Sequence, residues 1–457
     1  MTRHHGYALL SAIVAAIVAL SAAIYVSVAA DDGTGGNTHT LAGARAPHNS
    51  AAPVSTGVWV GAWSASPVGA EPGTETDGMA GRSVRNVVHA SVGGTSARIT
   101  LSNLYGRSRL TISHASIAVA AGTGTAAATT DTMRRLTFGG SPTVVVPAGR
   151  QVLSDVVTVR IPSGTDVLVT TYSPVPSGPV TYHPHARQTS YVAAGDRTED
   201  VTATAYTEQS EYWRYLTALD VLSDESDGTV VVLGDSLTDG ITSTENANRR
   251  WTDVLSQRVR TAVESGRDVP RYSVVNQGIS GNQVLADSSG LAYAGVRPAT
   301  DSPVAVNESG LGRFSRDVLG RTNVRAVVID LGVNDILRNP RLADPDKILA
   351  GLRTLVGQAH ARGLRVVGAT LMPFHGHRGY TPARESVRQR INAEIRAGRV
   401  YDAVVDFDQA LRDPYDPRRL RSDYDSGDHL HPSDKGYRRM AEEFDLDDLK
   451  GTAPAKL

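Results

Sequence analysis

The spacing of hydrophobic positions changes near residue 225 of this chain. Before that point, short runs rich in β-branched residues are separated by Gly, Pro and Asn, and the clearest of them cover residues 84–89, 97–101, 143–146, 156–159 and 167–172. Short apolar runs between turn-forming residues are typical of antiparallel strands. We therefore predict that residues 56–225 form a β-rich N-terminal domain built like an antiparallel β-sandwich.

After residue 225, strand-like runs alternate with longer amphipathic stretches. Strands are predicted at residues 229–233, 326–331, 365–370 and 403–407, with a further strand that begins at Val274 and runs into a Gly-rich turn. Helices are predicted at residues 251–264, 346–362, 383–397 and 433–443. Such alternation is the pattern of a doubly wound parallel sheet with helices on both faces. Residues 226–450 are therefore predicted to form an α/β domain.

An uncharged and largely apolar run lies near the N-terminus, from Tyr7 to Ala30. Its 24 residues exceed the apolar region of a signal peptide, about 7–15 residues, and suffice for a spanning helix, about 20. Arg3 before the run and two aspartates after it place the rest of the chain outside by the positive-inside rule. Residues 1–30 are therefore predicted to be a signal peptide or membrane anchor. The protein is expected to be extracytoplasmic, either secreted or anchored to the membrane by this segment.

Composition narrows the possible functions. Residues 31–55 are rich in Gly, Ala, Ser, Thr and Pro, which predicts a flexible linker. The 46 basic and 47 acidic side chains nearly cancel, so nothing in the charge suggests binding to nucleic acid. The chain has no cysteine, which excludes disulfides, cysteine nucleophiles and thiolate metal sites. No protein partner is implied.

A serine follows the first predicted parallel strand, in the sequence Gly-Asp-Ser-Leu that ends at Leu237. Open α/β sheets carry their chemistry at the carboxyl ends of the strands, and Ser236 lies at such an end. Gly234 allows the tight turn that would expose the serine hydroxyl. Ser236 is therefore a candidate nucleophile, although a strand, a turn and a serine also occur together by chance.

Two later turns supply candidate hydrogen-bond donors for a developing oxyanion. Gly281, in Ile-Ser-Gly-Asn, lacks a Cβ, so a reacting carbonyl could approach its backbone amide closely. Asn334, in Gly-Val-Asn-Asp, could donate a side-chain N–H. The alternatives are a packing glycine in an ordinary turn and an Asx turn or helix cap. The neighbouring Asp239, Asn282 and Asp335 are interpreted as turn or cap residues.

Asp428 and His431 lie three residues apart near the C-terminus. A serine nucleophile needs a base within hydrogen-bond reach, itself oriented by an acid, and one tight turn can bring these two side chains together. One alternative is a surface turn before a helix capped by Ser433 or Asp434. Another is a metal site formed by Asp428, His429 and His431, for which no second ligand cluster is present.

Together these four segments resemble those of the GDSL, or SGNH, hydrolase family, over residues 228–448. The resemblance implies a flavodoxin-like catalytic domain that cleaves an ester or thioester without a metal or organic cofactor. It also implies a catalytic triad of Ser236, Asp428 and His431, and an oxyanion hole formed by Ser236, Gly281 and Asn334. The β-rich region resembles the N-terminal β-domain of a subset of exported bacterial members.

Two polar loops inform the expected substrate. Residues 287–310 and 374–380 contain no long apolar face, whereas a lipase is expected to offer a hydrophobic lid or groove. His375 and His377 in the second loop are candidate substrate contacts. Trp59 and Trp63 are candidates either for the core or for a sugar-stacking platform.

The expected function is that of a serine esterase acting on short-chain acyl esters, of small molecules or of a polysaccharide. The alternatives are a lipase or phospholipase, an acyltransferase acting on a surface glycan, and a non-catalytic surface binding protein.

Overall fold

The computed structural model describes residues 57–289 and 306–453. The predicted signal peptide or anchor, the predicted linker and most of the loop 287–310 lie outside these residues. No helix in the described part of the chain is long and apolar enough to cross a membrane. The chain divides into two units, residues 1–55 and residues 56–457, and all the described residues belong to the second unit.

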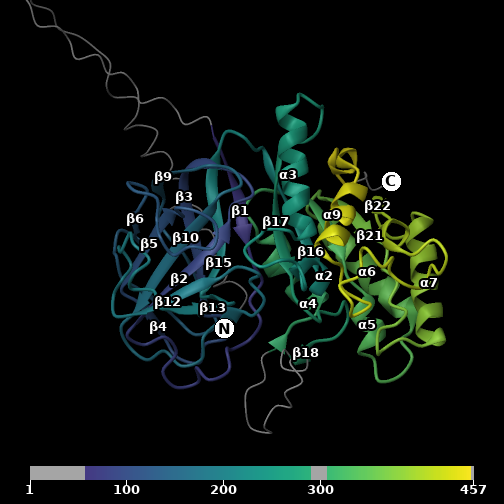
Figure 1. Cartoon of the computed structure of the whole chain (residues 1–457), viewed down its shortest axis with the longest axis horizontal. Helices are drawn as coiled ribbons and strands as arrows, with labels where there is room; N and C mark the ends of the chain where they lie inside the picture. Colours follow the sequence, from purple (N-terminus) through teal and green to yellow (C-terminus); the bar gives the residue numbers. More distant parts are fainter. Residues whose placement is uncertain (1–56, 290–305, 454–457) are drawn as a thin grey trace, which may run out of the picture. The chain divides into compact units, whose positions relative to one another are not determined.

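Two antiparallel sheets make up the β-rich region (Figure 1). The first has the order β1 (Val58–Ser64), β15 (Leu216–Ser223), β3 (Gly94–Ser102) and β8 (Gln151–Leu153), with β9 (Val157–Ile161) also paired to β3. The second has the order β13 (Glu208–Ser210), β12 (Ser190–Ala194), β2 (Arg82–His89), β10 (Asp166–Ser173), β5 (His114–Val119) and β6 (Arg134–Leu136). Two short pairs complete the region: β4 (Leu110–Ile112) with β7 (Val144–Val146), and β11 (Tyr182–His183) with β14 (Trp213–Arg214).

The core of this region lies between the two sheets. Inward-facing residues of the first sheet, such as Ile99 and Leu219, share one buried cluster with Val84 and Val169 of the second. The predicted sandwich-like arrangement is therefore confirmed. Trp63 belongs to the same cluster and meets Trp213 edge to face, so it is a core residue.

A five-stranded sheet forms the α/β region, with every neighbouring pair parallel. Its order is β17 (Tyr272–Gly278), β16 (Gly228–Gly234), β20 (Val324–Asp330), β21 (Arg365–Ala369) and β22 (Ala403–Val405). Counted along the chain, this is the order 2-1-3-4-5 of flavodoxin-like folds. The predicted doubly wound sheet is confirmed.

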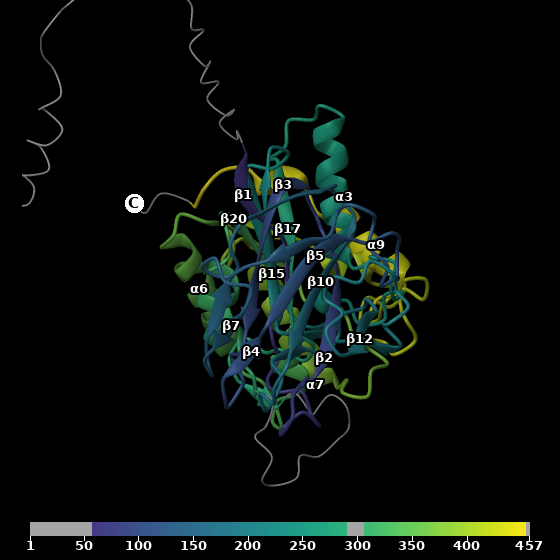
Figure 2. The ribbon, with the colours of Figure 1, turned by 90° about the vertical axis from the view of Figure 1, so that its left-hand side faces the viewer.

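Helices cover both faces of the parallel sheet (Figure 2). The four long helices are α3 (Trp251–Glu264), α6 (Pro345–His360), α7 (Pro382–Arg396) and α9 (Asp434–Glu443). Val231 and Leu233 of β16 pack in the cluster that includes α6 and α7, whereas Val230 and Val232 pack in the cluster with α3 and α9. Burial on both faces explains the uninterrupted apolar run of this strand.

The four predicted helices are confirmed: α3 has the predicted bounds, and the ends of α6, α7 and α9 differ from the predicted ones by at most two residues. The shifts follow the caps. Helix α6 begins after Asp344, whose side chain accepts the N–H of Asp346, and α7 begins after Thr381. In both helices a proline occupies the first turn, where its missing N–H costs nothing.

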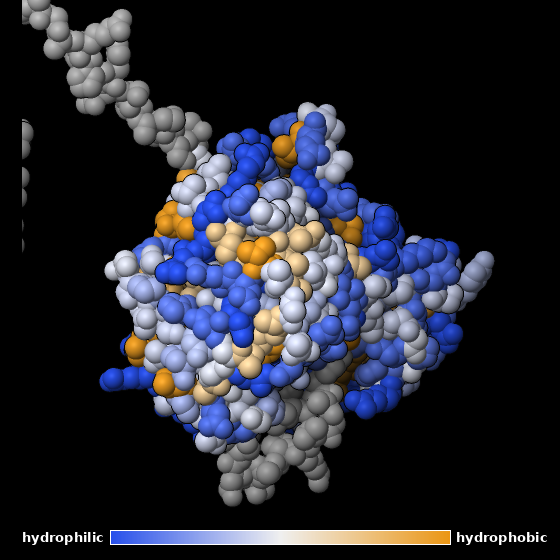
Figure 3. All heavy atoms as spheres, turned by 60° about the vertical axis from the view of Figure 1, so that its left-hand side comes forward, coloured by the Kyte–Doolittle hydropathy of each residue, from blue (hydrophilic) through white to orange (hydrophobic). Residues whose placement is uncertain are grey.

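Exposed large apolar side chains are scattered over the described residues. In the α/β region they are Leu285, Leu342 and Tyr415. On the face shown in Figure 3, which includes the β-rich region, hydrophilic residues surround small groups of apolar ones.

Candidate active site

Ser236 begins a four-residue helix, α2 (Ser236–Asp239), immediately after β16. Asp235 caps this helix by accepting the backbone N–H of Leu237 at 3.0 Å. A Cβ on Gly234 would collide with the side chain of Thr238, so the turn requires glycine there. The serine is consequently held at the carboxyl end of a central strand, and only 3% of its surface is exposed.

His431 lies against this serine, with its Nε2 atom 2.9 Å from the Oγ of Ser236. Its Nδ1 atom is 2.6 Å from one carboxylate oxygen of Asp428. The other oxygen of Asp428 accepts the backbone N–H groups of Leu430 and His431, at 2.9 and 2.8 Å. Two backbone N–H groups of the turn thus fix the carboxylate of Asp428, and this carboxylate in turn fixes the imidazole of His431. The structure joins Ser236, His431 and Asp428 by one continuous chain of hydrogen bonds.

The charge of Asp428 sets the direction of these bonds. Partial burial would raise the pKa of this carboxyl, but the hydrogen bond and the charge of His431, with the two backbone N–H groups, hold that pKa well below its ordinary value. An ionised carboxylate only accepts hydrogen bonds, so Nδ1 of His431 must carry a hydrogen. In the neutral ring Nε2 is then the acceptor, and it faces the serine hydroxyl.

Asn334 reaches the same place from the first turn of α5 (Val333–Leu337), which follows β20. Its Nδ2 donates to Asp235 at 3.1 Å, and its Oδ1 accepts the Nε–H of Arg338 at 3.2 Å. A carboxylate on one side and a guanidinium on the other fix which way the amide points. Gly332, at φ 130°, begins this helix in a conformation that side chains avoid.

Gly281 lies in the turn that follows β17, at φ +78°. A Cβ at this position would collide with the guanidinium of Arg338, the same group that holds Asn334. The turn is tied to the serine strand because the N–H of Ile279 donates to the carbonyl of Gly234 at 3.1 Å. Gly281 and Asn334 therefore both contact Arg338, and both lie at the carboxyl ends of the parallel strands, where Ser236 also lies.

Buried carboxyls lie beneath the serine turn. Burial, and then the charge of Asp330, raises the pKa of Asp235. Burial raises the pKa of Asp330, which accepts from Thr238, to about 6. Burial likewise raises the pKa of Asp335 to about 6, although its oxygens accept the backbone N–H groups of residues 284 and 285. Asp335 therefore holds a distant loop, whereas the sequence interpretation made it a turn or cap residue.

Asn282 also holds the turn in place. Its Nδ2 donates to Asn307 and to the carbonyl of Glu308, both at 2.6 Å, and its Oδ1 accepts from the fully buried Arg313 at 3.0 Å. Arg313 further donates to the carbonyl of Gly234 at 2.9 Å. A buried guanidinium thus joins the ends of β16 and β17.

The histidines of the loop 374–380 and of the C-terminal turn differ in position. His377 lies near Asp428 and His431. Burial lowers the pKa of His377, and the charge of Asp428 opposes this shift. His375 bonds to Asp416 at 3.1 Å and packs on Tyr380. His429 bonds to Asp425 at 2.6 Å. No group of three or more metal-ligating side chains occurs within residues 57–289 and 306–453.

Three residues of this site were not singled out from the sequence: Arg338, Arg313 and His183. Arg338 lies four residues after Asn334 in a helical turn, and that spacing could have indicated it. His183 belongs to the β-rich region and bonds to Asp239 at 3.0 Å. No spacing pattern links it to the serine turn.

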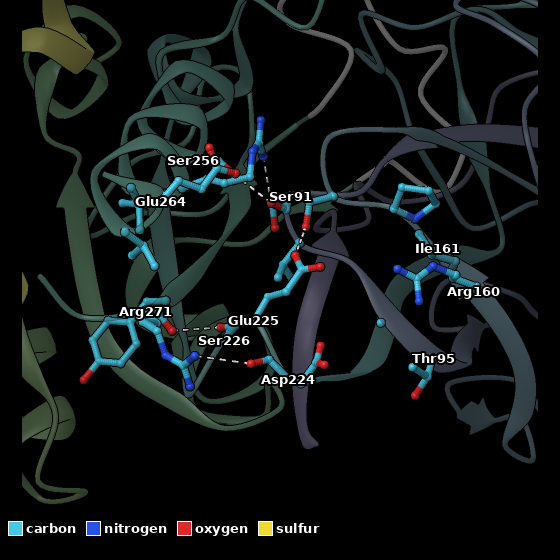
Figure 4. Close-up of a pocket in the computed structure, with 18 residues that line it drawn as sticks. Ser91, Thr95, Arg160, Ile161, Asp224, Glu225, Ser226, Ser256, Glu264 and Arg271 are labelled. Carbon is cyan, nitrogen blue, oxygen red and sulfur yellow. Dashed lines mark hydrogen bonds between the residues drawn. The ribbon is translucent and has the colours of Figure 1, made fainter. Parts of the chain in front are cut away.

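A cavity of about 530 Å³ lies elsewhere, between the β-rich region and α3 (Figure 4). Its lining includes Asp224, Glu225, Ser226 and Tyr272, which lie at the amino ends of β16 and β17. The candidate residues lie at the carboxyl ends of the same strands. This cavity is therefore separate from the serine site.

Several solved structures are similar to about half of the chain. A GDSL-like lipase from Bacteroides thetaiotaomicron is 21% identical over 47% of this chain and 84% of that chain, with a TM-score of 0.31. TesA is 22% identical, over 47% and 94%, with a TM-score of 0.33. The acetylxylan esterase Axe2 from Geobacillus stearothermophilus is 20% identical, over 49% and 94%, with a TM-score of 0.34. No curated protein matches the chain.

A family model gives the assignment. Residues 232–439 match the model of the GDSL-like lipase/acylhydrolase family. The match begins within β16 and extends into α9, so it covers the serine turn, both donor turns and the C-terminal histidine. The family resemblance noted in the sequence is confirmed for this region. Residues 232–439 of the α/β region therefore form a domain of the GDSL-like lipase/acylhydrolase family, whose members are hydrolases that act on ester bonds.

Proposed function

We propose that this protein is a serine esterase in which Ser236 is the nucleophile, His431 the base and Asp428 the residue that orients the base. The observation that carries the proposal is the unbroken line of two hydrogen bonds from the serine hydroxyl to the imidazole and on to the carboxylate. An imidazole held at Nδ1 by a carboxylate is the arrangement that turns a serine hydroxyl into a nucleophile.

The chemistry proceeds in two halves. The Oγ of Ser236 attacks the ester carbonyl carbon while its proton passes to Nε2 of His431, and Asp428 stabilises the imidazolium that results. The tetrahedral intermediate then expels the alcohol, which takes that proton from His431, and leaves an acyl-serine. Water repeats the sequence, with the base taking its proton, and releases the carboxylic acid.

The oxyanion is stabilised by the backbone N–H groups of Ser236 and Gly281 and by the side chain of Asn334. The N–H of Ser236 lies in the first turn of α2, where no intrahelical acceptor is available. The amide of Asn334 has two N–H bonds, and Asp235 accepts only one of them. The other can be directed at the oxyanion, while Arg338 keeps the amide from turning over.

For the substrate we propose short-chain acyl esters, in particular those of acylated carbohydrate outside the cell. Polar and charged groups lie around the serine, among them Arg338 and His377. In the described part of the α/β region the exposed large apolar side chains are Leu285, Leu342 and Tyr415, which are too few to form a long acyl groove. The extracytoplasmic setting rests on the N-terminal sequence.

The experiment varies the length of the acyl chain of the ester and labels the active-site serine. The specificity constant is measured across acetyl, butyryl, octanoyl and palmitoyl esters, and acetate release is measured from acetylated glycans. We expect the maximum at acetyl or butyryl, and covalent labelling of wild type by a fluorophosphonate that Ser236→Ala abolishes. Labelling at another serine contradicts the proposed nucleophile, and a maximum at octanoyl or beyond contradicts the short-acyl proposal.

A saccharide acceptor separates hydrolysis from acyl transfer. The rates of alcohol and acid release from one ester are compared with and without a soluble oligosaccharide. A hydrolase releases equal amounts of both in either case. Acid that falls behind alcohol only when the oligosaccharide is present identifies transfer.

A further inference from the structure

His183, from strand β11 of the β-rich region, is buried directly behind the serine turn. Only 3% of its surface is exposed. Its Nδ1 lies 2.8 Å from the backbone carbonyl of Ser66, and its Nε2 lies 3.0 Å from Oδ1 of Asp239, the last residue of α2. The two regions of the chain thus meet through a buried imidazole and a buried carboxylate.

Both partners of His183 are acceptors. A carbonyl oxygen cannot donate a hydrogen bond, and neither can an ionised carboxylate. A ring with hydrogens on both nitrogens satisfies both partners at once and forms an ion pair with Asp239. Burial would raise the pKa of Asp239, but the charge and hydrogen bond of His183 hold that pKa below its ordinary value. Removal of either member would leave a buried group without its counterpart, which is costly.

The second oxygen of Asp239 holds the turn that contains Gly281. It accepts the backbone N–H of Ser280 at 3.0 Å and the Oγ–H of the same residue at 2.5 Å. A Cβ at Gly278 would collide with the backbone of Asp239, so the turn rests directly on the end of α2. Ser280 precedes Gly281, and the peptide between them carries the N–H that Gly281 offers to the oxyanion.

The β-rich region also supports this turn through Ser66, which contacts Arg313. Arg313 donates to the carbonyl of Gln277 at 2.7 Å and to the Oγ of Ser66 at 2.9 Å. The carbonyl of Ser66 is also the acceptor for His183. One residue of the β-rich region thus contacts both supports of the turn.

We propose that His183 is a positioning residue of the esterase: by holding Asp239 it holds Ser280, and it thereby aims the backbone N–H of Gly281 at the oxyanion. The β-rich region is then a structural part of the active centre, in addition to any contact it makes with substrate. This inference rests on the proposed function, because it gives His183 a role in the same ester hydrolysis.

The kinetic experiment compares His183→Gln with His89→Gln. His89 provides a matched control, because it also pairs with an aspartate, Asp166, and also contacts the α/β region, at Asn248. We expect His183→Gln to lower kcat by up to about 100-fold, as a displaced catalytic group does, with KM for an acetyl ester within about a factor of two. His89→Gln should keep the wild-type kcat.

A tetrahedral inhibitor identifies the step that is affected. A boronic acid that adds to Ser236 places an oxygen in the oxyanion site, so its affinity for His183→Gln should fall in parallel with kcat/KM. A purely structural role would lower the amount of folded enzyme and leave inhibitor affinity per active site unchanged. That outcome, or an unchanged kcat, overturns the proposal.

Hydrogen exchange tests the geometry independently of catalysis. The amides of residues 279–282 are followed by mass spectrometry in wild type, His183→Gln and His89→Gln. Faster exchange of this peptide in His183→Gln alone supports the positioning role, and equal exchange in all three proteins overturns it. Should wild type hydrolyse no ester while this difference is present, the proposed function fails and the structural link stands.

A second variant covers a failure of His183→Gln to fold. Asp239→Asn keeps the size of the side chain and one acceptor oxygen but removes the charge that pairs with His183. It should also lower kcat and speed exchange at residues 279–282. Wild-type values for both quantities in this variant overturn the proposal.

Discussion

Two histidine–aspartate pairs flank the serine turn, and they differ in burial and in sequence separation. Asp428 and His431 lie three residues apart, and the side chain of Asp428 is 45% exposed. His183 and Asp239 lie 56 residues apart, and their side chains are 4% and 3% exposed. The second ring nitrogen of His431 faces a hydroxyl, whereas that of His183 faces a carbonyl oxygen.

The chemistry available to each pair follows from that difference. A hydroxyl can give up its proton to an imidazole, so the pair Asp428–His431 can take part in proton transfer. A carbonyl oxygen has no proton to give, so the pair His183–Asp239 can only hold its neighbours in place. The same two residue types can thus supply a base in one environment and only a support in the other.

The sharpest test of this contrast removes the base. His431→Ala should lower kcat by on the order of a millionfold, nearly as much as Ser236→Ala, because nucleophile and base act as a unit. Asp428→Asn should cost less, about ten-thousandfold. Steady-state kinetics on an acetyl ester measure all three effects. The control is His429→Asn, since asparagine tolerates the positive φ of 65° at that position, and its kcat should equal that of wild type.

A milder change removes one of the proposed oxyanion donors. Asn334→Ala should lower kcat by roughly 100–1,000-fold, as loss of a single donor does. KM should stay nearly constant, because the donor is needed chiefly in the transition state. The control Asn339→Ala lies in the same segment, where the side chain of Asn339 accepts the backbone N–H of Arg341. A large rise in KM with kcat preserved would make Asn334 a residue that binds the ground state.

The smallest expected effect concerns the acids beneath the serine. The pKa of buried Asp330 is raised to about 6, against about 3.9 in an unfolded chain. Its contribution to folding stability is therefore fully present below about pH 4 and is lost as the pH rises through about 6. Asp330→Asn stays neutral, so between about pH 4 and pH 8 its free energy of unfolding should gain about 1–3 kcal/mol relative to wild type.

Urea denaturation at the two pH values measures this change. Asp155→Asn is the control, because hydrogen bonds from Thr137 and the amides of Gly140 and Gly139 hold the pKa of Asp155 below its ordinary value. The stability that this carboxylate contributes is gained mainly below about pH 4, so the difference between this variant and wild type should change little between the two pH values. A pH-independent difference between Asp330→Asn and wild type would show that Asp330 is ionised in the folded protein throughout this range.

Much of the fold could be predicted because its signals are local. Burial on both faces gives β16 its continuous apolar run, and the prolines at the start of α6 and α7 mark where those helices begin. The residues that now line the candidate site were also indicated locally, by glycine turns at strand ends and by an aspartate three residues before a histidine.

The rest could not be predicted because it depends on contacts between distant segments. Ser66 and Gln277 are 211 residues apart and hydrogen-bonded, and Ser66 and Arg313 are 247 apart. Nothing in the spacing of such residues indicates that they meet. The role of a lone histidine in a β-rich region is visible only once the two regions are folded against each other.

The order of the chain has a consequence for when the enzyme becomes active. Strand β1 pairs with β15, so the β-rich region closes only after residue 223 has been made, and His431 follows Ser236 by 195 residues. Contacts between distant segments form late, because closing long loops costs entropy before it brings any gain. An incomplete chain that ends between Ser236 and the final turn has the proposed nucleophile but not the proposed base. By the proposed mechanism, reactivity toward esters therefore arises only after the turn that contains His431 has been made and can fold onto the sheet.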